Sequence, residues 1–284
     1  MFSSMPSYMP AGNLPGIPKF KTPIEFLWAT MTKPLMYGWF HIMCLVAVFV
    51  LCSIIIARRN KIGDKTVTRA LAVFWFIVFI FEIIKQINFS YSPSSGEWAY
   101  QWYIFPFQFC SSILYVLPVA LLTKSEKIRS LAYSFMASFN LFAGTAVMLY
   151  PSTVFIEDVS INLQTMIHHG LMVVSAVLII ATKKASLSPK TVLRGLAVFS
   201  VLVAVAFALN IIFASKDGFN MFYIDVEGCH LPILNLIFDK VPYPAFLLCY
   251  FLGFTVCALA IVAIAWLISK GIKAASKKLL HHYS

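Results

Sequence analysis

The stretch that decides the fold of this protein is YGWFHIMCLVAVFVLCSIIIA, residues 37–57, which is followed directly by the basic run RRNKIGDK, residues 58–65. The first stretch contains no Asp, Glu, Lys or Arg. About 20 apolar residues are needed to cross the roughly 30 Å hydrocarbon layer of a bilayer. The two stretches together predict a membrane span whose basic end faces the cytoplasm.

The composition of the whole chain agrees with this prediction. Of its 284 residues, 60% are hydrophobic and 12% are charged, and the mean hydropathy is +0.84. In soluble domains about a quarter of all residues are charged. A soluble fold is therefore excluded, and the length suits a single membrane domain with several spans.

We predict an all-α, polytopic transmembrane bundle of about seven spans. The expected spans are 37–57, 70–87, 103–122, 129–150, 160–182, 191–214 and 244–269. They form a membrane domain over 37–269, between a proline-rich leader, 1–36, and a basic tail, 270–284. Part of the leader, 23–35, is expected to form a short interfacial helix. Pro106 and Pro118 interrupt the third span, so a bundle of six spans is an alternative.

Basic residues cluster in alternate connections, which predicts the orientation. They lie between spans one and two, three and four, and five and six, and in the tail: Arg58, Arg59, Lys61, Lys65, Arg69, Lys124, Lys127, Arg129, Lys183, Lys184, Lys190, Arg194, Lys270, Lys273, Lys277 and Lys278. These segments are expected inside, with the N-terminus and the long loop 215–243 outside. Since this pattern accounts for most of the basic residues, the net charge of +11 does not imply a nucleic-acid partner.

Polar residues within the spans gather in the predicted outer halves. They are Glu82, Lys85, Cys110, Asn140, Gln164, His168, His169 and Asn210. Polar groups are costly in hydrocarbon, so they tend to face a partner or a wet cavity. At 1.5 Å per helical residue, Cys110 is expected about 10 Å below the outer end of span three and His169 about 13 Å below that of span five. The two residues are therefore predicted to lie at the same depth.

Structural roles compete with a functional reading of these residues. Glu82 and Lys85, one helical turn apart, can neutralise each other, and the amides and imidazoles can join helices by hydrogen bonds. The cysteines show no metal-type spacing and the histidines no His-x-x-x-His pattern, so we expect neither a metal nor another cofactor. Adjacent helical residues point about 100° apart, so only one of His168 and His169 is expected to face a reaction centre. Gln164 shares the face of His168, and periodicity alone does not choose between the two histidines.

Four short motifs carry a resemblance to a known family. They are GEW at 96–98, FPFQFC at 105–110, MIHHGL at 166–171 and GFNMF at 218–222. In order and spacing they resemble the YwaF-like family of bacterial integral membrane proteins, which is related to the eukaryotic transmembrane protein 164, over roughly residues 70–270. That family usually has Leu-Pro-Leu-His-Leu-Cys before the cysteine and a histidine directly before Gly-Leu. This maps its functional pair onto Cys110 and His169, with Gln108 replacing the customary histidine and His168 as a substitute for it.

The resemblance implies an activity and a location. The eukaryotic relative uses a cysteine to move acyl chains between phospholipids, so a membrane-embedded, cysteine-dependent acyltransferase is expected, or a lipase if water accepts the acyl group. Membrane lipids are the expected partners, with no protein partner indicated, and the bacterial plasma membrane is the expected location. Gln108, Asn140 and Asn220 are candidate donors to the oxyanion of the reaction.

Two other classes of function remain open at this point. A transporter or receptor would bind a small solute or ion in the outer polar cluster, which the charges of Glu82 and Lys85 favour. A lipid enzyme should open sideways toward the bilayer, whereas a transporter should show related halves, and we find no internal repeat. In a purely structural or assembly protein, Cys110 and His169 would point toward lipid or lie far apart.

Overall fold

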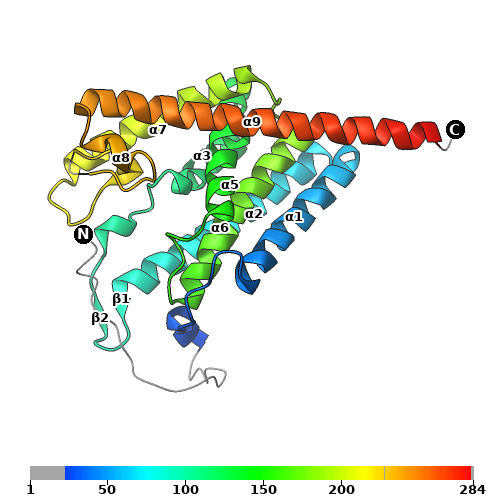
Figure 1. The fold of residues 1–284 in the computed structure, drawn as a ribbon. Helices are drawn as coiled ribbons and strands as arrows, with labels where there is room; N and C mark the ends of the chain where they lie inside the picture. The colour runs from blue at the N-terminus through cyan, green and yellow to red at the C-terminus, as the bar shows by residue number, and fades with distance from the viewer. Residues whose placement is uncertain (1–22, 227, 283–284) are drawn as a thin grey trace.

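The computed structural model describes residues 23–226 and 228–282, which are mostly helical (Figure 1). Six helical stretches in this part of the chain are long and apolar enough to cross a membrane. They are α1 (Trp39–Arg58), α2 (Asp64–Ser90), α4 (Glu126–Phe135) continued through η5 (Met136–Asn140) into α5 (Leu141–Leu149), α6 (Val159–Ala181), α7 (Pro189–Ile212) and α9 (Tyr243–His282). The predicted helical membrane bundle is confirmed, and α9 continues into the predicted tail.

The third predicted span differs from the expectation. Only a 3-10 turn, η4 (Cys110–Ser112), and helix α3 (Ile113–Leu122) are helical, and together they are shorter than a bilayer crossing. Before them, η3 (Trp102–Ile104) is a single turn, and Phe105 is extended with ψ of 132°. Proline disfavours helical geometry in the residue that precedes it, and Pro106 follows Phe105. The continuous helix expected from Tyr103 is therefore wrong, and Cys110 lies at the start of a short helix rather than inside a long one.

Pro118 is accommodated within α3 by a neighbouring helix. A proline has no N–H, so the carbonyl four residues earlier, at Leu114, loses its helical partner. The indole Nε1 of Trp75, on α2, donates to this oxygen at 3.0 Å. Helix α2 therefore satisfies the group that Pro118 leaves free, as a membrane interior requires.

The connections define two ends of the bundle. At the end that we call the basic end, Lys184 after α6 pairs with Asp64 of α2, and Arg194 of α7 donates to Ser130 of α4. At the opposite end, the loop end, lie the hairpin of β1 (Tyr91–Ser92) and β2 (Glu97–Trp98) and the segments 213–226 and 228–242, which contain η6 (Met221–Tyr223) and α8 (Asn235–Phe238). Which end faces the cytoplasm stays a prediction from the charge pattern.

Part of the expected leader packs against the helices at the loop end. The helix predicted over 23–35 is a 3-10 helix confined to η1 (Pro23–Trp28), and residues 1–22 lie outside the described part of the chain. The indole of Trp28 donates to the Asn88 carbonyl at 3.2 Å, and Ser160 donates to the Leu27 carbonyl at 2.8 Å. These contacts tie η1 across the ends of α2 and α6.

Helix α6 is the centre of the bundle and packs against α1, α2 and α5. Most of its side chains are buried, whereas α1, α2 and α9 turn most of theirs outward. Gly144 allows α5 to approach closely: a Cβ there would lie 2.8 Å from the Cβ of Met172 and 2.9 Å from the carbonyl oxygen of His169. The position of the α6 histidines therefore depends on this glycine.

Gly144→Ala should lower the unfolding temperature of the detergent-purified protein by several degrees, because an added methyl overpacks a close contact at a cost of about 1–3 kcal/mol. Gly253→Ala on α9 is the matched control, since no atom lies within 4 Å of its added Cβ. Equal unfolding temperatures of the two variants would contradict the close approach of α5 and α6.

Candidate functional site

The structure brings Cys110 together with His168 of α6. Nε2 of His168 lies 3.1 Å from the carbonyl oxygen of Cys110. Nδ1 of His169 lies 2.7 Å from the carbonyl oxygen of Thr165, one turn earlier on the same helix. The centroids of the two imidazole rings are 5.3 Å apart. Of the two histidines, His168 bonds Cys110, through the Cys110 backbone, whereas His169 bonds its own helix; the predicted contact between Cys110 and His169 therefore stays a prediction.

These contacts determine the tautomer of each neutral imidazole. A carbonyl oxygen only accepts hydrogen bonds, so the ring nitrogen that faces it carries the hydrogen and the other nitrogen carries a lone pair. The lone-pair nitrogens are Nδ1 of His168 and Nε2 of His169. Both are buried and have no hydrogen-bond partner among the residues described. The site therefore contains two oriented, uncommitted bases.

Glu82 and Lys85 form the ion pair that their spacing predicts. Nζ of Lys85 lies 2.7 Å from Oε1 of Glu82, and the Gln86 amide donates to the same oxygen at 2.7 Å. Glu82 is only 5% exposed, and its second oxygen, Oε2, is buried without a partner. The ammonium of Lys85 is within electrostatic range of Cys110 and both histidines. The pair is thus mutually neutralised and adjoins the Cys110 region.

A cavity of about 470 Å³ opens at the side of the bundle near the loop end. It lies between α2 and the segment 98–106, and its lining is mostly apolar: Phe79, Glu82, Ile83, Gln86, Ile87, Ser90, Trp98, Tyr100 and Pro106. Burial, and then the charge of Glu82, raise the pKa of the Tyr100 phenol. Cys110, His168 and His169 are not part of this lining. The cavity therefore reaches Glu82, beside the Cys110 region, from the lateral surface.

Two of the predicted site residues, Gln108 and Asn210, hold a backbone turn. The side-chain amide of Gln108 donates to the Asn220 carbonyl at 2.8 Å and accepts from the Phe222 N–H at 2.9 Å. Asn210 bonds both backbone groups of Met221, at 3.1 and 2.7 Å. The turn needs this support because Phe222 is left-handed, with φ of 59°. Such a conformation is unusual for a residue with a side chain.

The comparison with known families covers the part of the chain that contains these site residues. A model of the TMEM164 family matches residues 36–269, which include every helix from α1 to α7 and most of α9. This chain belongs to the TMEM164 family. No curated protein and no solved structure is significantly similar to it. The related family inferred from the four sequence motifs is consistent with this assignment, and a multi-pass membrane protein follows from it.

Three predicted residues of this TMEM164 family member remain: Asn220, Asn140 and Gln164. Asn220 donates to the Gly228 carbonyl at 2.7 Å and accepts from the Asp225 N–H at 3.0 Å. Asn140, on the π-helical turn η5, donates to the Met172 carbonyl at 3.1 Å, while its Oδ1 is buried without a partner. Gln164 accepts a long contact of 3.5 Å from Thr165. The amide groups of Gln108 and Asn220 thus already donate to backbone carbonyls.

Two residues of the site were missed by the sequence analysis. Gln86 bridges Glu82 and the Ile104 carbonyl, at 2.7 and 2.9 Å, and so links α2 to the irregular segment before Cys110. Its spacing of i, i+4 from Glu82 was a usable signal. Ser112, two residues after Cys110, has a buried hydroxyl without a partner, and no sequence pattern marked it.

A metal site was not expected in this TMEM164 family member. Within residues 23–226 and 228–282, no three His, Cys, Asp or Glu side chains lie together in a way that could hold a metal ion.

Gln108→Glu should loosen the turn 220–225, because a carboxylate cannot donate to the Asn220 carbonyl and an unpaired buried group costs about 1–3 kcal/mol. Hydrogen exchange of the backbone amides in this turn should become faster. Gln101→Glu is the control, since Gln101 donates to an exposed carbonyl, that of Ala99. Unchanged exchange in Gln108→Glu would mean that Asn210 alone holds the turn.

Proposed function

We propose that this TMEM164 family member is a membrane-embedded enzyme that takes an acyl group from a phospholipid ester onto Cys110. The acyl group then passes to a lysophospholipid, or to water in a lipase reaction. The observation that carries the proposal is the pair of oriented imidazoles on α6, one of which bonds the backbone of Cys110. The family resemblance of the cysteine and histidine motifs supports it. We place the reaction in the cell membrane, as expected for a bacterial relative.

The proposed chemistry needs a base next to the thiol. A thiol in apolar surroundings stays protonated and unreactive unless a base or a cation stabilises the thiolate. In the first step the imidazole takes the proton of Cys110, and the sulfur forms a bond to the ester carbonyl carbon. The bond from that carbon to the alcohol oxygen breaks, and the imidazolium protonates the departing lysolipid. The acceptor hydroxyl then repeats these steps in reverse on the thioester.

His169 is the proposed base and His168 the positioning residue. His169 is the histidine to which the family motif maps, and its Nε2 carries the lone pair because Nδ1 is bonded to Thr165. Nε2 of His168 is occupied by the carbonyl of Cys110, which fixes the backbone from which the thiol projects. Lys85, within electrostatic range of Cys110, favours the thiolate, although its pairing with Glu82 reduces this effect.

The lateral cavity is the proposed entry for the lipid. It opens sideways, as a lipid substrate requires, and exposed apolar side chains of Phe79 and Ile83 flank it. Gln86 and Ser90 carry buried oxygens without partners beside it, which suits a polar ester or headgroup region. An amphipathic substrate fits this combination better than a soluble one.

Incubation of the purified protein with a phospholipid labelled in its acyl chain should give a covalent adduct that hydroxylamine releases. Cys110→Ala should abolish the adduct, and His169→Ala should slow its formation at least 100-fold, the usual effect of removing a general base. Cys257→Ala, a partly exposed cysteine of α9, is the matched control and should label normally. Equal labelling of Cys110→Ala and the wild type would exclude this mechanism.

The same experiment tests the assignment of the two histidines. His168→Ala should lower the unfolding temperature, because it leaves the Cys110 carbonyl unpaired, whereas His169→Ala should mainly slow labelling. If His168→Ala alone stops labelling and leaves the unfolding temperature unchanged, the base is His168.

A solute-binding protein is the second candidate, and the unpaired oxygens of Glu82, Gln86 and Ser90 at one cavity favour it. In that case Glu82→Gln should abolish uptake or binding of a cationic solute, and no acyl adduct should form on any variant. An adduct on wild type that Glu82→Gln leaves intact would favour the enzyme.

A further inference from the structure

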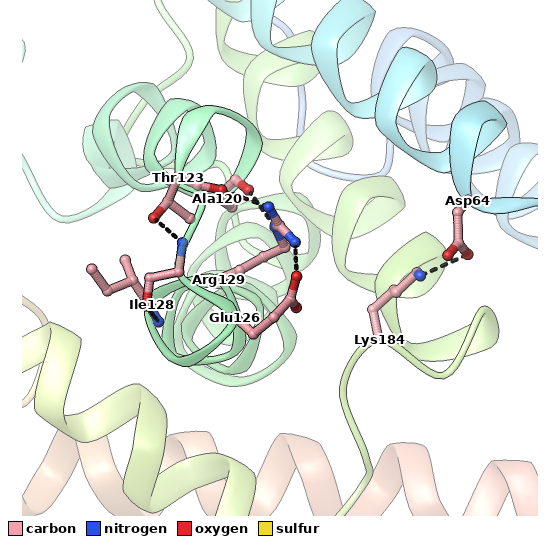
Figure 2. Close-up of polar contacts among 8 residues, drawn as sticks. Asp64, Ala120, Thr123, Glu126, Ile128, Arg129 and Lys184 are labelled. Carbon is pink, nitrogen blue, oxygen red and sulfur yellow. Dashed lines mark hydrogen bonds and ion pairs between the residues drawn. The ribbon is translucent and has the colours of Figure 1, made fainter.

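A second cavity, of about 530 Å³, lies at the basic end, away from Cys110. It lies among the ends of α2, α3, α4 and α6 and is lined by Asp64, Val67, Thr68, Ala120, Leu121, Glu126, Arg129, Ser130, Tyr133, Lys183 and Lys184. Figure 2 shows its two polar groups, the Asp64–Lys184 pair and the contacts around Arg129. Nothing in the proposed acyl transfer uses this cavity.

Two of the three cations already have partners. Arg129 donates to the Ala120 and Thr123 carbonyls, at 3.3 and 2.5 Å, and to Glu126, and so caps the end of α3. Lys184 pairs with Asp64 at 2.7 Å. The acidic partners are largely exposed, with side-chain exposures of 83% for Glu126 and 85% for Asp64. Exposed ion pairs are weak, so an entering anion can displace these carboxylates at little cost.

The third cation, Lys183, is exposed and has no recorded contact to another described side chain. Its backbone ends α6 in a Schellman motif: Lys184 N–H bonds the Ile179 carbonyl and Lys183 N–H bonds the Ile180 carbonyl. The motif puts Lys183 in the left-handed region, with φ of 61°. Glycine is the usual residue at this position, because it has no Cβ to clash. Lys183 therefore occupies a backbone conformation that disfavours a residue with a side chain.

Tyr133 supplies a second, independent feature of a ligand site. Its side chain is 6% exposed and lines the cavity. The phenol lies within electrostatic range of Arg129, Lys184, Asp64 and Glu126, yet none of the recorded hydrogen bonds of the described residues involves it. Most of the side chain is buried, but the hydroxyl oxygen is not one of the fully buried, unpaired groups of the described residues, so water or a ligand in the cavity can reach it. It is free to donate to an anion among these cations.

The walls and the place of the cavity indicate the kind of anion. Val67, Ala120 and Leu121 form an apolar part of the lining. The N-termini of α2 and α4, which attract negative charge, adjoin it at Asp64 and Glu126. A cavity at the ends of membrane helices lies at the depth of lipid headgroups, where basic clusters bind anionic lipids. We propose that this cavity binds the phosphate headgroup of an anionic phospholipid, through Lys183, Lys184 and the Tyr133 hydroxyl.

The test is titration of the detergent-purified, full-length protein with phosphatidylglycerol, followed by its unfolding temperature. Wild type should be stabilised saturably, and phosphatidylcholine, which has no net charge, should do much less. Lys183→Gly should weaken the apparent affinity about fivefold, the usual effect of one basic residue near a lipid surface. Tyr133→Phe should weaken it about tenfold, as expected for a hydrogen bond to a charged group.

The variants are chosen so that misfolding cannot imitate the result. Lys183→Gly suits the left-handed backbone, so without lipid its unfolding temperature should equal or exceed that of wild type. Lys124→Gly, in the connection between α3 and α4, removes one positive charge from the same end but not from the cavity lining, and should bind normally. Wild-type affinity in both Lys183→Gly and Tyr133→Phe would overturn the proposal. So would equal stabilisation by glycerol phosphate, which would identify a soluble ligand.

Discussion

The structure depends on one constraint: backbone groups that leave regular helices inside a membrane bundle must find partners within the protein. The chain before α3 is irregular, and the carbonyl of Cys110 finds Nε2 of His168 on α6. The Ile104 carbonyl accepts a hydrogen bond from the Gln86 amide. The Leu114 carbonyl, which Pro118 leaves without a helical partner, accepts one from the Trp75 indole. The polar side chains of the bundle are placed largely where helical hydrogen bonding fails.

This constraint also explains why the candidate site can be reactive. A histidine that bonds a carbonyl through one nitrogen presents a lone pair at the other. Because His168 and His169 each bond a backbone carbonyl, their other ring nitrogens are two oriented bases. Structural and chemical roles, which the sequence analysis treats as alternatives, are compatible in the same residue. The amides of Gln108 and Asn210 differ, because their backbone partners occupy both of their ends.

The two ends of the bundle are specialised in different ways. At the loop end, the β hairpin contributes Trp98 to the lateral cavity, and the turn 220–225 is bonded to Gln108, two residues before Cys110. At the basic end, short connections leave charged residues around a second cavity. Helix α6 runs between them, with its histidines in its middle and Lys183 and Lys184 at its end. Both proposed lipid contacts thus involve α6, which is buried along most of its length.

The sequence by itself determined the membrane class, the helical spans and the Glu82–Lys85 pair, because hydrophobic runs and i, i+3 spacing are local properties. Only the tertiary structure decided that the third segment is a short helix from Cys110, that His168 bonds Cys110, and that Gln108 and Asn220 serve a turn. The contacts of His168 with Cys110 and of Gln108 with Phe222 join residues 58 and 114 positions apart, and their geometry depends on how helices pack rather than on any local pattern.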